Sequence, residues 1–312
     1  MKKRTLKVSA MVMAAVMMAG AALTGCSGGS GSAQTTAADT TAAVSDTTAA
    51  DTAAAGDTAA ADTAGGDVSA DVQKIIDAGK MKVGCKVDVP NFGLQNTETS
   101  EFEGVEVDLA YEIAGKIFGC TADEAKEKGL IEFQGVNAKT RGPLLDNGEL
   151  DMVIATYTIT EERKESWNFS SPYYTDAVGL LVLKESGINS MADVDGKVIG
   201  VAQGSTTKDA ISAYIEEQGL DVTPVFEEFD GYPALAAALA AKNIDVFSVD
   251  RAILSGYNDD TTQILPDRFA EQDYGVATKL ENKGLAELVE GVVTDLKDSG
   301  KMDEMLKEWG IE

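Results

Sequence analysis

Residues 130–155 read LIEFQGVNAKTRGPLLDNGELDMVIA and place one predicted helix between two predicted strands. Apolar residues dominate 130–133 and 151–155, which is typical of short buried strands. Between them, residues 140–145 form a predicted helix, and Asn147-Gly148 supplies residues that commonly end one. Parallel strands need a crossover connection, usually a helix, so strands that alternate with helices in this way predict parallel α/β layers.

The same alternation extends in both directions from this stretch. Toward the N-terminus lie a predicted strand at 81–85, a short one at Val105-Glu106-Val107, and a helix that Asp108 caps. Toward the C-terminus the predicted strands are 179–183, 198–201, 225–229 and 245–249, the predicted helices are 208–217 and 232–241, and two helices close the chain over 284–309. The fold class is therefore α/β, with two units of roughly 100 residues each.

The N-terminus carries the pattern of an export signal. Lys2, Lys3, Arg4 and Lys7 precede an apolar run over 8–23 that is short for a bilayer span. The run ends in Leu23-Thr24-Gly25-Cys26, which resembles the lipobox of bacterial lipoproteins; an uncleaved anchor or a chance cysteine is the alternative. We expect residues 1–25 to be a lipoprotein signal peptide and Cys26 to carry the lipid that holds the protein on the outer face of the cell membrane. Residues 26–70, dominated by Ala, Thr, Asp, Gly and Ser, are predicted to be a disordered linker.

The composition excludes several classes of function. A formal net charge of −26 repels nucleic acids and anionic surfaces, so polyanions are not expected partners. The chain has no histidine, which excludes His-dependent catalytic triads and His-ligated metal sites. Besides Cys26 only Cys85 and Cys120 remain, and they are either buried thiols, which the apolar strand around Cys85 favours, or one disulfide permitted by export. We expect no metal and no cofactor.

Six segments between about Met81 and the C-terminus carry a family resemblance. They are 104–110 (GVEVDLA), 151–163 (DMVIATYTITEER), 168–174 (NFSSPYY), 198–205 (VIGVAQGS), 245–250 (DVFSVD) and 307–310 (KEWG). In this order they resemble the amino-acid-binding, family 3 solute-binding proteins of ABC transporters, and most of all the aspartate- and glutamate-binding members. A match along most of the chain is far more specific than any single motif.

The resemblance implies a two-lobed periplasmic-binding-protein fold of type II, with lobes joined by two crossing strands near 173–177 and 273–277. Residues 71–177 and 273–312 would form lobe 1 and residues 178–272 lobe 2. It further implies a monomer that is not an enzyme, binds a small amino acid between the lobes, and is read in its closed form by an ABC permease.

The resemblance assigns the ligand's α-carboxylate to Arg163, with Thr156 and Thr158 nearby; the Thr matching Thr158 supplies hydroxyl and amide contacts. The chemistry suits the assignment, because a planar guanidinium offers two parallel donors to a carboxylate. The alternative is that Arg163 pairs with Glu161 or Glu165 on the surface.

The resemblance implies that three further residues contact the ligand. Asp250 ends a predicted strand and matches the family's acid for the α-ammonium, although it can also cap the helix that follows. Ser205 and Thr206 precede a predicted helix, where they can receive a carboxylate or serve as structural caps.

Lys86 and Arg141 set the predicted side-chain specificity. In the aspartate- and glutamate-binding members that this chain resembles, the matching residues engage the side-chain carboxylate. With Arg163 and Asp250 they sum to +2, and one charge pair at about 4 Å is worth roughly 4 kcal/mol at an effective dielectric near 20, before desolvation. We therefore expect glutamate or aspartate, with glutamine or another polar amino acid as the alternative. With no neighbouring partner, either cation could instead be solvated.

Two other classes of protein use the same fold. A few members act as dehydratases on prephenate- or arogenate-like acids, but Asp250 is the only evident general acid in this chain. A sensor that presents its ligand to a signalling receptor would need the same pocket as a transport protein.

Overall fold

The structure, a computed structural model, describes residues 68–311. The predicted signal peptide (1–25), the predicted lipid attachment at Cys26 and the predicted linker up to residue 67 lie outside the described residues. Within the described part, no helix is both long and apolar enough to cross a bilayer. The first helix, α1 (Ala70–Ala78), begins where the linker was predicted to end.

Five strands form the sheet of lobe 1, in the order β5-β1-β6-β14-β7. They are β1 (Met81–Lys86), β5 (Ile131–Val136), β6 (Met152–Ile154), β7 (Trp167–Phe169) and β14 (Ala277–Lys279). β1 lies between β5 and β6 and pairs in parallel with both, which confirms the predicted parallel α/β arrangement, and β14 runs antiparallel to β6 and β7. Met152 and Ile154 face one hydrophobic core and Val153 and Ala155 the other, so the sheet is buried on both sides.

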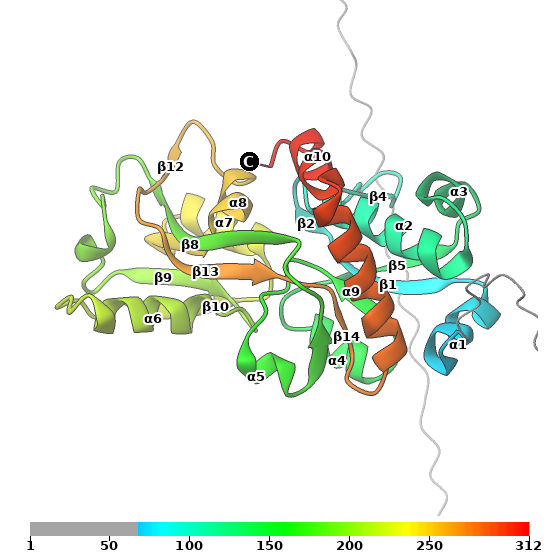
Figure 1. The fold of residues 1–312 in the computed structure, drawn as a ribbon. Coiled ribbons are helices and arrows are strands. Elements are labelled where there is room, and N and C mark those ends of the chain that lie inside the picture. The colour runs from blue at the N-terminus through cyan, green and yellow to red at the C-terminus, as the bar shows by residue number, and fades with distance from the viewer. Residues whose placement is uncertain (1–67, 312) are drawn as a thin grey trace, which may run out of the picture. The chain divides into compact units, whose positions relative to one another are not determined.

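Helices cover both faces of the lobe 1 sheet (Figure 1). α1, α2 (Val105–Phe118), α9 (Lys283–Asp298) and α10 (Lys301–Glu308) share one core, and α4 (Arg141–Asp146) packs on the other. The shorter elements of this lobe are α3 (Ala122–Glu127), α5 (Glu161–Lys164) and a three-stranded sheet of β2 (Asp88–Val89), β3 (Gly93–Gln95) and β4 (Phe102–Glu103). The predicted closing helices are thus present and pack on lobe 1, where the indole Nε1 of Trp309 donates to Asp108.

Six strands form the sheet of lobe 2, in the order β10-β9-β11-β8-β12, with β13 also pairing with β8. They are β8 (Tyr174–Leu183), β9 (Val198–Ala202), β10 (Val225–Phe229), β11 (Val246–Asp250), β12 (Thr262–Ile264) and β13 (Phe269–Tyr274). α6 (Thr207–Glu217) covers one face, and α7 (Tyr232–Ala240) and α8 (Arg251–Ser255) the other; a 3-10 turn, η1, spans Met191–Asp193. β9 lies in parallel between β10 and β11, which repeats the α/β pattern of lobe 1.

The two lobes are joined by two chain crossings that lie beside each other. The chain passes from β7 into β8 and returns from β13 into β14, and β8 and β13 run side by side (Figure 1). The amide of Tyr173 donates to the carbonyl of Tyr274 at 2.9 Å, and the amide of Ser170 donates to the carbonyl of Val276 at 3.0 Å. The prediction of a two-lobed type II fold is therefore confirmed.

One predicted element is wrong: Val105-Glu106-Val107 is the first turn of α2 and not a strand. Gly104 has φ 125°, a value that favours glycine, and it turns the chain into the helix. The amides of Val105 and Glu106 then donate to the carbonyls of Asn91 and Phe92, so another segment satisfies the first turn of the helix. Asp108 consequently lies inside the helix instead of capping it.

Cys85 and Cys120 are both free thiols, Cys85 buried and Cys120 half-buried. The buried-thiol alternative is therefore confirmed for Cys85, and no disulfide joins the two cysteines.

Candidate functional site

All eight residues predicted to bind the ligand follow the carboxyl ends of parallel strands. In lobe 1, Lys86 ends β1, Arg141 follows β5, and Thr156, Thr158 and Arg163 follow β6. In lobe 2, Ser205 and Thr206 follow β9, and Asp250 ends β11. Side chains at the carboxyl edge of a parallel sheet project into the space where open α/β sheets bind ligands.

Arg141 is a buried cation without a carboxylate of its own. Only 3% of its surface is exposed. Its Nη1 donates to the carbonyls of Ala155 and Thr156 at 2.5 and 2.9 Å, its guanidinium carbon lies 3.9 Å from the Tyr157 ring centroid, and its Nε has no hydrogen-bond partner. No ion pair within 4 Å involves it among the described residues. A guanidinium this deep with a free donor can bind an anion.

Arg163 reaches from lobe 1 to lobe 2. Its Nη1 donates to the carbonyl of Thr158 at 2.7 Å, and its Nη2 donates to the carbonyl of Gly204 at 3.1 Å. It also lies over the ring of Tyr157, 4.7 Å from the centroid. Burial, with the neighbouring charge of Arg141, lowers the pKa of Arg163 to about 10. The alternative of a surface pair does not hold, since Lys164 and not Arg163 contacts Glu161.

Asp250 presents a buried carboxylate from lobe 2. It occupies the N-cap position of α8 but makes no side-chain cap bond, and its Oδ2 instead accepts a hydrogen bond from the hydroxyl of Tyr274. Burial raises the pKa of Asp250 to about 7, and the charge of Asp176 adds to the rise, while the Tyr274 bond and the charges of Arg141 and Arg163 oppose it. A ligand ammonium would stabilise the ionised form of this group.

Two of the hydroxyl groups predicted to bind the ligand, those of Thr158 and Thr206, donate hydrogen bonds to Gln272, which was not predicted as a site residue. Gln272 Oε1 accepts from the hydroxyls of Thr158 at 2.8 Å and of Thr206 at 2.7 Å. It thereby links a loop of lobe 1 to the start of α6 in lobe 2. The hydroxyl of Ser205 donates to the carbonyl of Ala202, and neither Ser205 nor Thr206 caps α6 with its side chain. Nothing in the sequence near Gln272 signals this link, because it depends on how the lobes meet.

Lys86 is buried and has an acidic partner, so the alternative of a solvated cation does not hold. It is 1% exposed, its Nζ lies 3.2 Å from Asp88 Oδ1, and the same ammonium sits 4.2 Å from the ring centroid of Tyr232 in lobe 2. Burial lowers the pKa of Lys86, and the charge of Asp88 opposes that shift. The spacing in the sequence could have revealed this pair, because residues i and i+2 of an extended chain point to the same side.

Glu106 is a buried carboxylate that the sequence did not identify. It is fully buried in the first turn of α2, and its Oε1 accepts from the amide of Thr156 at 2.5 Å and from the hydroxyl of Tyr173 at 2.6 Å. Burial raises the pKa of Glu106, against the effect of these two hydrogen bonds. Thr156 has φ 43°, a left-handed backbone that only surrounding contacts can maintain in a threonine. Glu106 therefore holds the strained turn whose carbonyl receives Arg141.

We expect Glu106→Ala to lower the free energy of unfolding by about 2–4 kcal/mol, because it leaves the Thr156 amide and the Tyr173 hydroxyl buried without an acceptor. Glu106→Gln is the matched control, since it retains one acceptor oxygen and removes the charge. Urea denaturation at a fixed pH measures both. An alanine variant with the unfolding midpoint of the wild type would show that Glu106 does not hold this turn.

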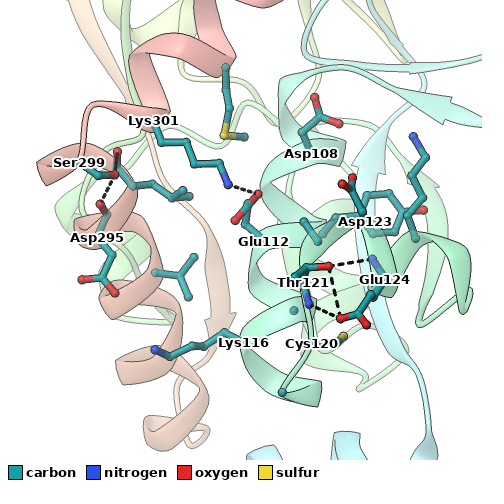
Figure 2. Close-up of a pocket in the computed structure, with 18 of the residues that line it drawn as sticks. Asp108, Glu112, Lys116, Cys120, Thr121, Asp123, Glu124, Asp295, Ser299 and Lys301 are labelled. Atoms are coloured by element: carbon teal, nitrogen blue, oxygen red, sulfur yellow. Dashed lines mark hydrogen bonds and ion pairs between the residues drawn. The ribbon is translucent and has the colours of Figure 1, made fainter.

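A large surface groove lies away from all of these residues. It is a groove of about 1180 Å³ between α2, α3, α9 and α10, and Figure 2 shows its polar lining. There Lys301 pairs with Glu112 at 2.6 Å, and Thr121 and Glu124 cap α3 reciprocally. None of the eight predicted ligand-binding residues lines this groove, so the candidate site is the buried cluster between the lobes.

Comparison with known proteins agrees with this architecture. The sequence profile of the bacterial extracellular solute-binding proteins, family 3, matches residues 81–312. A glutamine-binding protein of Geobacillus stearothermophilus is 39% identical over 68% of this chain and 77% of its own length. The glutamate-binding protein GluB of Corynebacterium glutamicum is 30% identical over 75% and 79%, respectively. The structure of an ancestral arginine-binding protein bound to arginine superposes with a TM-score of 0.63 at 28% identity, covering 74% of this chain and 98% of that one. The chain belongs to the bacterial extracellular solute-binding proteins of family 3.

Proposed function

We propose that this protein captures a free α-amino acid between its lobes for an ABC transporter, and that its ligand is glutamine. One observation carries the first part: Asp250 of lobe 2 is buried and Arg163 of lobe 1 is half-buried, each influences the ionisation of the other, and neither has an ion-pair partner among the described residues. An α-amino acid carries the complementary pair of charges. Its carboxylate would lie on Arg163 and its ammonium on Asp250, as the family resemblance implies.

The choice of glutamine depends on the charges around the ligand side chain. The sum of +2 that favoured an acidic ligand counted Lys86, Arg141, Arg163 and Asp250. Asp88 and Glu106 belong to the same buried cluster, since both influence the ionisation of Lys86. Three cations then face three carboxylates, and a ligand with an uncharged polar side chain preserves this balance. The glutamine-binding relative supports the same choice.

Glutamate is the second candidate, and one observation favours it. Arg141 is buried with a free Nε and no carboxylate partner among the described residues, so a side-chain carboxylate has a donor available. The glutamate-binding relative is consistent with this alternative. Aspartate would need to reach the same donor with a chain one methylene shorter.

Isothermal titration of the full chain with the amino acids tests the proposal. We expect glutamine to bind at least tenfold more tightly than glutamate, a difference of about 1.4 kcal/mol, and we expect lysine and arginine not to bind measurably. A thermal-shift screen over the same ligands should rank them in the same order, because a ligand of the folded state raises the melting temperature. Tighter binding of glutamate would restore the prediction made from the sequence.

Export, lipid attachment at Cys26, the monomeric state and delivery to a permease are part of this proposal. Metabolic labelling with a radioactive fatty acid, lost on Cys26→Ser, tests the anchor. The dehydratase alternative predicts turnover of prephenate or arogenate by the purified protein, and the absence of turnover together with glutamine binding would remove it.

A further inference from the structure

We propose that Asp88 determines the specificity for the ligand's side-chain charge, by pairing with Lys86 and making that end of the site electroneutral. The inference rests on the proposed function, because it concerns which side chain the amino-acid site accepts. Neither the sequence pattern nor the family resemblance assigned a role to Asp88.

The first step is that Lys86 has a single anionic contact. Within the described residues its only ion pair is with Asp88, at 3.2 Å, and the two side chains are 1% and 9% exposed. The same ammonium also lies over the ring of Tyr232. The net charge that Lys86 presents to a ligand is therefore set by Asp88. At this burial, removing one member of the pair leaves the other charge uncompensated.

The second step is that contacts with lobe 2 hold the Asp88 carboxylate in place. Its Oδ2 accepts from the amide of Tyr232 at 3.3 Å, and this residue begins α7, a helix of nine residues. The carbonyl of Asp88 accepts from the hydroxyl of Tyr257 at 2.5 Å. The carboxylate thus lies between the Lys86 ammonium and the positive end of a helix dipole. It has little freedom to turn away from Lys86 when the lobes are closed.

The consequence for the ligand follows from this fixed pair. A ligand carboxylate brought to Lys86 would share the ammonium with Asp88 and be repelled by it, whereas a ligand amide meets no net charge. Substituting Asp88 by asparagine removes the repulsion, and the amide oxygen can still accept from the Tyr232 amide. Lys86 would then present an uncompensated positive charge that favours glutamate.

The test is isothermal titration of the full chain with glutamine and with glutamate. We expect Asp88→Asn to shift the ratio of the two dissociation constants toward glutamate by at least tenfold. Lys86→Met should shift the ratio in the opposite direction, because it leaves the Asp88 carboxylate unpaired. In the double variant the local charge again sums to zero, so the ratio should return to within about threefold of the wild type.

Asp77→Asn is the matched control, because it removes the same charge from an exposed residue of α1 whose only side-chain hydrogen bond among the described residues is to Gln73. We expect it to leave the ratio within twofold of the wild type. Wild-type protein that binds glutamine, with a ratio unmoved by both Asp88→Asn and Lys86→Met, would overturn the role of Asp88 while leaving the proposed function intact. Wild-type protein that binds neither ligand would overturn both. Thermal melting shows whether each variant is folded. If Asp88→Asn does not fold, the shift in the ratio caused by Lys86→Met tests the proposal.

Discussion

Arg163→Ala is expected to weaken amino-acid binding by at least about thirtyfold. The substitution removes the donor pair for the ligand α-carboxylate, and it also removes the bond to the carbonyl of Gly204 across the lobes. Truncating one member of a buried, hydrogen-bonded charge pair costs about 2–5 kcal/mol. That range corresponds to roughly 30- to 5000-fold in the dissociation constant.

Arg163→Lys separates charge from geometry in the same experiment. It retains the positive charge but offers a point donor in place of the planar fork, so it should recover only part of the loss. Equal binding by the wild type and the alanine variant would show that the α-carboxylate does not lie on Arg163. Melting temperatures measured without ligand control for loss of fold.

Asp250→Asn is expected to weaken glutamine binding by about ten- to a hundredfold, because the ligand ammonium loses the buried carboxylate that would balance it. The asparagine keeps an oxygen that can accept from the Tyr274 hydroxyl, so the fold should persist. Titration calorimetry at pH 8 provides the comparison. A dissociation constant within twofold of the wild type would contradict the assignment.

The same carboxylate predicts how binding depends on pH. With its pKa raised to about 7, Asp250 of the free protein takes up a proton as the pH falls through 7, whereas the ligand ammonium requires the ionised form. Binding therefore releases a proton, and the affinity for glutamine should fall about tenfold between pH 8 and pH 6. Glutamine itself does not titrate in this window, and Asp250→Asn should abolish the dependence. Equal affinities of the wild type for glutamine at pH 6 and pH 8 would show that the titration of Asp250 does not control binding.

Local pattern predicted the strands and helices of the fold well, because each buried strand has its own apolar run. Val225–Phe229 was predicted with the bounds that the structure gives to β10. Val105-Glu106-Val107 was assigned the wrong structure because three residues of alternating polarity fit a short strand. Its helical conformation depends on Gly104 and on carbonyls supplied by Asn91 and Phe92, more than ten residues earlier. Such a contact leaves no trace in local periodicity.

The site was predicted unevenly for a related physical reason. Arg163 and Asp250 were predicted as ligand contacts because they stand in segments that resemble the family. The buried partners of Thr158 and Thr156 were not predicted: Gln272 is 114 residues from Thr158, and Glu106 is 50 residues from Thr156. The pairing of Lys86 with Asp88 could have been predicted, because the side chains of alternate residues in an extended segment point to the same side. Electrostatic sums over a site need every buried carboxylate, including those from distant segments.

The hydrogen bonds between the two chain crossings have a mechanical consequence. Because Ser170 and Tyr173 are bonded to Val276 and Tyr274, the connectors form one ladder and must bend together. A bonded ribbon resists sliding of one strand past the other, so we expect any opening of the lobes to follow a single axis without lateral slip. Asp88 would then meet the same Tyr232 amide, and Arg163 the same Gly204 carbonyl, each time the lobes close.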